Sequence, residues 1–274
     1  MKFINTFSKL LAIASVVIIS SCGGEEKPAA PKYNFERADS LPTGYLQELG
    51  IIKTNIEVTA QLYQDLGAAG YSFSESILLS AGKSFSGSSK QAMGIGAIGS
   101  DMVYAGAYAQ TQSAMSRMEG LLKTAGDLGI AEAFDQELME KMASDDTTIN
   151  KSVLLTKAYL NAKDQLFSDE RAQYATFMVI GGWIEGLHIS CQMTKDELSD
   201  QNIRLGVWSV CNAYTNVMQM TDVFSDNADM QKITEELKTI KEPLNKILKN
   251  SKKFSSDDVK ALAEAVSEIR GKLY

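Results

Sequence analysis

The 274 residues contain a single histidine, His188, and only three cysteines, Cys22, Cys191 and Cys211. One imidazole excludes metal sites built from several histidines, and any hydrolytic triad would depend on His188 alone. We therefore expect no metal, no cofactor and no enzymatic activity.

Proline is also scarce, and its absence predicts the fold class. Residues 43–242 contain none, whereas average usage of about 5% would place about ten there. Few stretches alternate apolar and polar residues as a half-buried strand does, and Ala, Leu, Met, Gln, Glu and Lys favour helix throughout. We predict a compact all-α domain of about eight helices over residues 41–274.

Positive charge is in the minority. The formal net charge is −7, and it becomes −9 once Lys2 and Lys9 are removed with the N-terminal segment. An acidic chain argues against nucleic acid as a partner.

The N-terminal segment is typical of a secretory signal peptide over residues 1–21. Lys2 and Lys9 precede a short apolar run and small residues, a pattern too short for a membrane-spanning domain. The residues Ile19-Ser20-Ser21-Cys22 resemble the lipobox of bacterial lipoproteins. That resemblance implies cleavage before Cys22, diacylglycerol on the Cys22 sulfur and a third acyl chain on its amine, which would anchor the chain to a membrane.

Residues 22–40 are predicted to form the lipidated cysteine and a flexible tether, because they contain two prolines and few apolar side chains. Gly23 is not the Asp that signals inner-membrane retention in lipoproteins of many double-membraned bacteria. We expect attachment to the outer membrane, and the sequence leaves open whether the domain lies on the periplasmic or the cell-surface side.

One stretch, residues 94–109, is almost free of charge and rich in glycine and alanine. Small residues that recur at helical spacing let a second backbone approach closely. The recurring small residues are Ala92, Gly96, Gly99, Gly106 and Ala107. We predict one long helix over 88–127, paired at the centre of the domain with a helix over 169–191.

The last quarter of the chain, residues 225–274, differs in kind from this central pair. Two runs of apolar residues step by three and four, as in amphipathic helices. They predict a C-terminal helical hairpin whose first helix is kinked at Pro243 and whose second helix is capped by residues 255–258.

Polar side chains interrupt both predicted central helices. Asp101, Tyr104 and Tyr108 form a stripe on the first, and Glu185 and His188 lie three residues apart on the second. These five residues either line a small ligand cavity or form a closed hydrogen-bond network, and we favour the network. A Glu185–His188 pair tuned for proton transfer is the minor alternative to a structural contact.

Cys191 and Cys211 are predicted to lie on successive antiparallel helices. Their expected axial offset is about 24 Å, and a disulfide permits only about 6 Å between Cα atoms. Two buried free thiols are therefore predicted.

Two motifs resemble a known family. Gly181-Gly-Trp-Ile-Glu-Gly-Leu-His-Ile-Ser190 and Gly99-Ser-Asp-Met-Val-Tyr-Ala-Gly-Ala-Tyr-Ala-Gln-Thr-Gln112 resemble, over about residues 45–225, uncharacterised helical lipoproteins of Bacteroidota. That family usually has Tyr at the position of His188, which weakens a catalytic role for this residue. The resemblance implies an all-α periplasmic or surface domain and supplies no activity.

Two functional hypotheses follow. The first is a membrane-tethered, non-enzymatic envelope lipoprotein that presents a helical surface to an envelope protein. The alternative is a binding module that encloses a small apolar or amphipathic ligand between the central helices.

Overall fold

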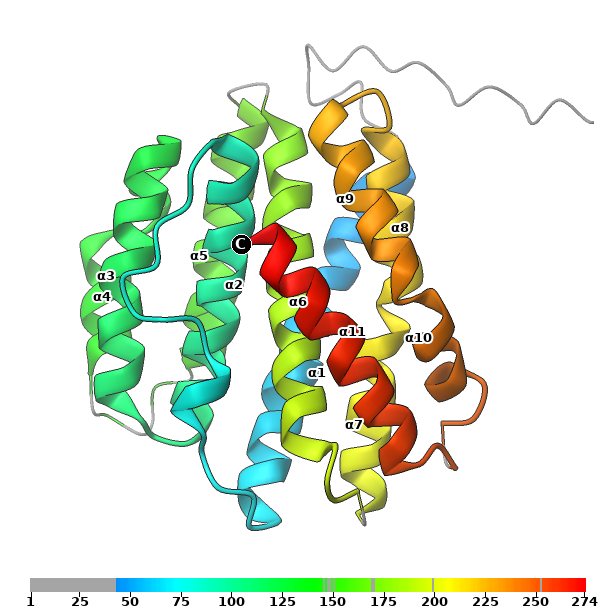
Figure 1. Cartoon of the computed structure of the whole chain (residues 1–274). Coiled ribbons are helices and arrows are strands. Elements are labelled where there is room, and N and C mark those ends of the chain that lie inside the picture. Colours follow the sequence, from blue (N-terminus) through cyan, green and yellow to red (C-terminus); the bar gives the residue numbers. More distant parts are fainter. Residues whose placement is uncertain are drawn as a thin grey trace, which may run out of the picture. The chain divides into compact units, whose positions relative to one another are not determined.

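The computed structural model describes residues 43–144, 146, 149, 151–168, 171–198, 200–251 and 253–274. The predicted signal peptide, Cys22 and the tether to residue 40 lie outside the described residues. Among the described residues every regular element is a helix, which confirms the all-α class (Figure 1). The eleven α-helices of this part are α1 (Thr43–Ala68), α2 (Ser88–Ala107), α3 (Thr111–Leu128), α4 (Gln136–Ala143), α5 (Lys151–Ser168), α6 (Ala172–Thr194), α7 (Gln201–Asn212), α8 (Tyr214–Val223), α9 (Ala228–Thr239), α10 (Lys241–Leu248) and α11 (Ser256–Leu273).

The predicted single helix over 88–127 is wrong, because α2 and α3 are separated by a tight turn. Ala109 takes a left-handed conformation with φ of 52°. Its N–H bonds the Gly106 carbonyl at 3.1 Å, and the Gln110 N–H bonds the Ala105 carbonyl at 2.8 Å. This is a Schellman ending, which usually has glycine at the left-handed position, and α3 then returns along α2.

A loop with a capped end separates α6 from α7. α6 continues to Thr194, and α7 begins only after Asp200, whose carboxylate accepts hydrogen bonds from the N–H groups of Asn202 and Ile203 at 2.7 and 3.0 Å. An aspartate in this position satisfies amide groups that have no partner within the helix.

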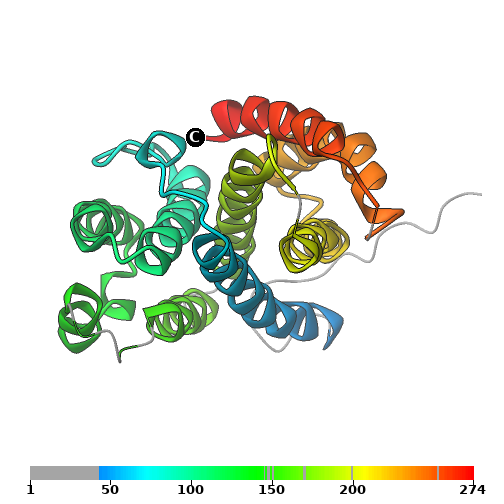
Figure 2. The same cartoon turned by 90° about the horizontal axis from the view of Figure 1, so that it is seen from below.

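The predicted central pair is confirmed for α2, the first part of the predicted helix, which packs against α6. Gly181 of α6 lies beside Met93 of α2, and Gly186 lies beside Ser100, so the two helices run parallel (Figures 1 and 2). A Cβ atom on Gly96 would overlap the Met178 carbonyl oxygen, and one on Gly181 would overlap the Met93 carbonyl oxygen. The small residues therefore permit direct backbone contact, as the sequence predicted.

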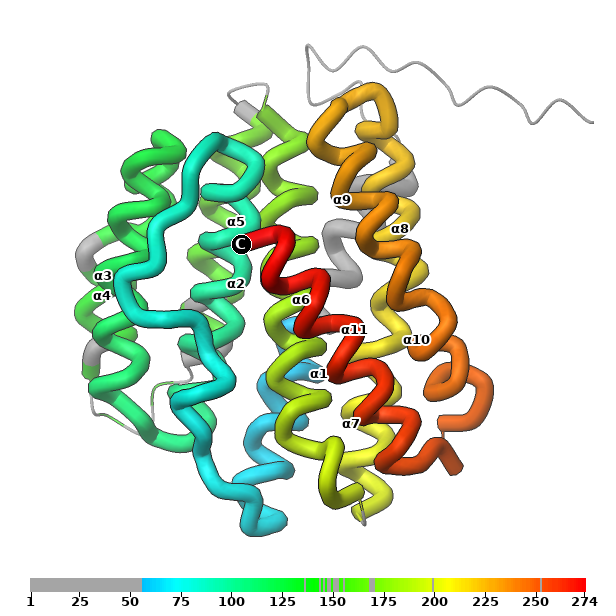
Figure 3. The backbone as a smooth tube through the Cα atoms, in the orientation of Figure 1, coloured from blue at the N-terminus to red at the C-terminus, as the bar shows by residue number. Residues whose placement is uncertain are grey.

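The other helices surround this pair. α3 packs on α2, α1 and α5 each contact both central helices, and α11 lies across α6 (Figures 1 and 3). No described helix has the combination of length and hydropathy that crossing a membrane requires.

The C-terminal segment forms the predicted hairpin, in which α9 and α10 pack against α11. The first arm breaks between Thr239 and Lys241, just before Pro243, because proline lacks the N–H that would continue the helix. Ser255 and Asp258 form a reciprocal capping box at the start of α11.

Candidate functional site

Asp101 lies in the middle of α2 with its side chain fully buried. Its Oδ2 accepts hydrogen bonds from the Leu79 N–H at 3.0 Å and from Arg117 Nε at 3.3 Å. Arg117, on α3, also donates through Nη2 to the Leu79 carbonyl at 2.9 Å. The backbone N–H and carbonyl of Leu79 are thus both bound by side chains, and regular structure in this segment is limited to a 3₁₀ turn at Glu75–Ile77.

Glu185 of α6 is equally buried and is held by Arg270 of α11. Arg270 Nε donates to Oε2 at 2.7 Å, and Nη2 donates to Oε1 at 2.6 Å. Two parallel hydrogen bonds between ionised groups form the strongest pairing that a carboxylate makes with a side chain.

Asp101 and Glu185 influence each other electrostatically. Asp101 Oδ1 has no hydrogen-bond partner among the described residues. Burial raises the pKa of Asp101 well above its ordinary value, the charge of Glu185 raises it further, and Arg117 opposes them.

These opposing effects differ between the two acids, and burial keeps Asp101 protonated. Burial raises the pKa of Glu185 too, but the Arg270 guanidinium lowers it. Arg117 pairs in addition with the exposed Glu75 at 2.7 Å. With Asp101 neutral, the cluster holds two guanidinium groups and two carboxylates, so its charges balance.

His188 does not join this cluster. Its Nε2 lies 3.1 Å from the Ile77 carbonyl oxygen and its Nδ1 lies 3.4 Å from Ser267 Oγ. Burial, with the positive charge of Arg270, lowers the pKa of His188 to about 4, so the ring is neutral near pH 7. The minor alternative of a charged Glu185–His188 pair is therefore wrong, because Arg270 occupies the carboxylate.

Tyr104 and Tyr108 belong to an aromatic cluster at the end of α2. The Tyr104 hydroxyl accepts a hydrogen bond from the Ser74 N–H at 3.0 Å and donates to Met193 Sδ at 3.1 Å. Its ring stacks on Phe73 with centroids 5.1 Å apart, and Tyr108 lies 5.0 Å away. The Tyr108 hydroxyl has no hydrogen-bond partner among the described residues, and the ring contributes by packing.

A cavity of about 120 Å³ lies on a different face of α2 from Asp101. Residues from α1, α3, α5, α7 and α8 complete the walls that α2 and α6 provide. The α2 wall consists of Ile95, Gly96, Gly99, Ser100 and Val103.

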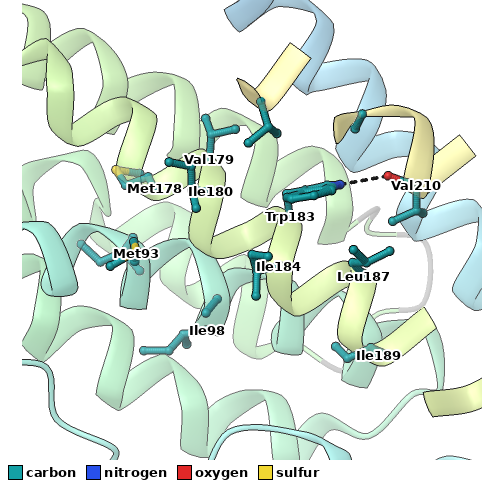
Figure 4. Packing of buried hydrophobic residues seen from close by; sticks show 14 of the residues in the cluster. Met93, Ile98, Met178, Val179, Ile180, Trp183, Ile184, Leu187, Ile189 and Val210 are labelled. Carbon is teal, nitrogen blue, oxygen red and sulfur yellow. Dashed lines mark hydrogen bonds between the residues drawn. The ribbon is translucent and has the colours of Figure 1, made fainter. Parts of the chain in front are cut away.

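Hydrocarbon forms most of the other walls. The α6 wall consists of Met178, Val179, Gly182 and Trp183, and the indole N–H of Trp183 is already bound to the Val210 carbonyl at 2.9 Å (Figure 4). A Cβ atom on Gly99 would meet no atom within 4 Å. The predicted close helix contact therefore holds at Gly96 and fails at Gly99, where the backbone borders empty space.

The structure places the five polar residues in separate groups of contacts. Asp101 is bonded to Arg117 and Glu185 to Arg270, whereas His188 and Tyr104 bond other groups. None of Asp101, Tyr104, Tyr108, Glu185 and His188 lines the cavity, so the interpretation of these residues as ligand contacts stays a prediction that this cavity does not support. Sequence reasoning missed Ser100, Val103 and Trp183, whose only signal is helical spacing from the glycines.

The two remaining cysteines are free and buried, as predicted. Burial raises the pKa of Cys191 to about 12, which makes it an inert thiol. Burial, with a further contribution from Cys191, raises the pKa of Cys211 well above its ordinary value as well.

No group of three or more His, Cys, Asp or Glu side chains in the described ranges is arranged to hold a metal ion. A scan against protein-family models, a search of curated proteins and a search of solved structures each gave no match.

Proposed function

We propose that this chain is a non-enzymatic binding protein of the bacterial cell envelope, tethered to the outer membrane through Cys22, which holds a small apolar or amphipathic ligand between α2 and α6. The observation that carries the proposal is the cavity of about 120 Å³ bordered by Gly96, Gly99 and Gly182.

Ligand pockets in proteins are concave and mostly apolar, with a few polar groups in their walls. The cavity fits this description. Several of its lining residues, among them Gly99, Ser100 and Val103, are only partly buried, so a ligand can reach the cavity from solvent. A side chain at Gly99 would fill the space without a clash at its Cβ atom, and a bound ligand would restore the same contacts.

The chemistry around the cavity supports binding rather than catalysis. The lining residues of the described part include no charged side chain. Asp101 and Glu185 are each bonded to an arginine, and both ring nitrogens of His188 have partners. A general acid or base needs to reach a substrate atom, and these groups are engaged elsewhere.

A protein-binding surface, the first hypothesis from the sequence, has less support. Large exposed hydrophobic side chains in the described part are Met115, Val153 and Leu205. They lie on α3, α5 and α7, one on each helix, whereas interaction sites gather apolar residues into a contiguous patch.

Trp183 offers a direct test, since it lines the cavity and Trp208 is the only other tryptophan. In a Trp208→Phe background, bromobenzene should quench Trp183 fluorescence in a saturable manner. Gly99→Leu should abolish this quenching by filling the cavity. Gly126→Leu is the matched control, because Gly126 is an exposed glycine of α3 with equally open space and lies outside the cavity.

Unsaturable quenching, or equal quenching in both leucine variants, would overturn the proposal. Mass spectrometry of the gently purified protein gives a second readout. We expect a copurifying small molecule in the wild type and the Gly126→Leu control, and its loss in Gly99→Leu. A stoichiometric protein partner without a small molecule would favour the surface hypothesis instead.

A further inference from the structure

The cavity extends across both central helices. Its walls include Leu121 of α3 and Val210 of α7. α3 packs on α2 and α7 packs on α6, and these two outer helices lie on opposite sides of the central pair (Figures 1 and 2). Because the axes of packed helices are about 8 to 10 Å apart, a cavity that reaches both outer helices is elongated, and its long direction runs across the helix axes.

Glycines form the floor between the two ends of the cavity. Gly96 of α2 faces Gly182 of α6, since a Cβ atom on Gly182 would lie 3.2 Å from the Gly96 carbonyl oxygen. A Cβ atom on Gly99, three residues further along α2, would meet no atom within 4 Å. These three residues have no side chain that could rise from the floor and divide the cavity into two halves. A ligand can therefore lie over both helices at once.

Both ends of the cavity are closed by hydrocarbon. Leu121 and Phe134 line one end, where the 3₁₀ turn Ala131–Ala133 packs on α3. Val210 and Val217 line the other end, where α7 and α8 pack on α6. All four side chains are buried, and none of them carries a polar atom. Burying a polar group without a hydrogen bond is costly, so each end favours an apolar part of a ligand.

A compact ligand would contact one end of the cavity and leave the other end empty. An extended chain contacts both ends, and its dispersion contacts add up atom by atom. Given the ligand-binding function proposed above, on which this inference rests, we propose that the ligand is an extended hydrocarbon chain, such as the acyl chain of a lipid, that lies across α2 and α6 over Gly96 and Gly182. The rest of the ligand leaves the cavity beside Ser100 and Val103, which line it and are only partly buried.

Two isomeric bromides test the shape of the ligand on the full chain with Trp208→Phe, in which each probe quenches Trp183 directly. 1-Bromohexane is an extended chain, and 1-bromo-3,3-dimethylbutane has the same atoms in a compact form. We expect 1-bromohexane to bind about tenfold more tightly, because about two more of its carbon atoms contact the walls. Equal affinity, or tighter binding of the compact isomer, would overturn the inference and leave the proposed function intact. If neither isomer quenches Trp183 in a saturable manner, the proposed function itself fails.

Substitutions at the two ends test whether one ligand reaches both. Leu121→Phe narrows one end, and Val217→Phe narrows the other. Met115→Phe and Leu205→Phe are the matched controls, because they place the same side chain at exposed positions outside the cavity. We expect each end variant to weaken 1-bromooctane at least about tenfold and 1-bromopropane less than about threefold, and the controls to bind both probes as the parent does. Weakening by only one end variant would confine the ligand to a single end and overturn the inference. The comparison of isomers does not require these variants to fold.

Mass spectrometry of the protein purified without detergent distinguishes the sources of the chain. A fatty acid and a phospholipid both contain an extended hydrocarbon chain and differ in mass, so either of them would support the inference. A copurifying compound built from fused rings, without a chain, would overturn it.

Discussion

Asp101 and Glu185 are both buried in the interior of the helical domain, and each is bonded to its own arginine, Asp101 to Arg117 and Glu185 to Arg270. Because the folded pKa of Asp101 is raised above its unfolded value, its contribution to stability is complete below about pH 4 and is lost as pH rises through the folded pKa.

Asp101→Asn should remove this pH dependence, because the amide is neutral at every pH. We expect the unfolding free energy of the variant, relative to the wild type, to increase from pH 5 to pH 8 in urea denaturation. Glu75→Gln, which removes the exposed partner of Arg117, should leave the slope almost unchanged. A wild-type to Asp101→Asn difference that is constant with pH would contradict the raised pKa of Asp101.

The pKa of His188 should lie far below that of a free imidazole. As the only histidine it gives a single Cε1 proton resonance, and we expect a midpoint near pH 4 in the folded protein and near 6.5 in urea. Between these values the unfolded chain binds more protons, so His188 makes stability rise as pH increases across this window, by about 3 kcal/mol in total. A folded midpoint near 6.5 would refute the buried neutral ring.

Gly96 and Gly99 lie three residues apart on α2 and should respond to alanine in opposite directions. Gly96→Ala forces a methyl group into the Met178 carbonyl, and we expect a loss of about 3 kcal/mol in chemical denaturation. Gly99→Ala meets only empty space, and it should gain about 1 kcal/mol from helix propensity. Gly126→Ala calibrates the propensity gain at an exposed position. Equal losses at Gly96 and Gly99 would mean that the cavity is filled by protein.

Ala109→Gly should stabilise the protein by about 1 kcal/mol, because an L-residue with a side chain pays a steric penalty in the left-handed conformation. The matched control is Ala107→Gly, two residues earlier within α2, which should destabilise by a similar amount. A thermal melt of both variants gives the two signs. Destabilisation by both would mean that residue 109 is helical and that α2 and α3 are continuous.

The proposed anchor at Cys22 predicts membrane association that resists high salt, because inserted hydrocarbon is not held by charge that salt can screen. Cys22→Ala alone would mislead, since the uncleaved apolar segment could hold the variant in the membrane. Replacing residues 1–22 with an ordinary cleavable signal should release a helical domain that needs no detergent. A continued requirement for detergent would show that another part of the chain binds the bilayer.

The central packing was predictable because its causes are local in sequence. Glycine at helical spacing and the near absence of charge identify α2, and the same reasoning identifies α6. The capping box at Ser255 was equally readable. The break at Ala109 was not, because alanine normally continues a helix and here occupies the position that glycine usually takes.

The site was only half predictable. Asp101 and Glu185 were recognisable as acids within apolar helices. Arg117 and Arg270 were not, since arginines on amphipathic helices usually extend into solvent, and their partners lie 16 and 85 residues away. The cavity had no signal of its own, because an unfilled volume depends on how side chains from seven helices stop short of one another.

Arg270 also makes the centre of the domain depend on the end of the chain. Its partner Glu185 lies 85 residues earlier in the sequence. A chain that lacked the last turns of α11 would carry the buried carboxylate without its guanidinium, and an uncompensated buried charge is strongly disfavoured. Loss of these turns would therefore destabilise α6 in the interior as well as the C-terminal hairpin.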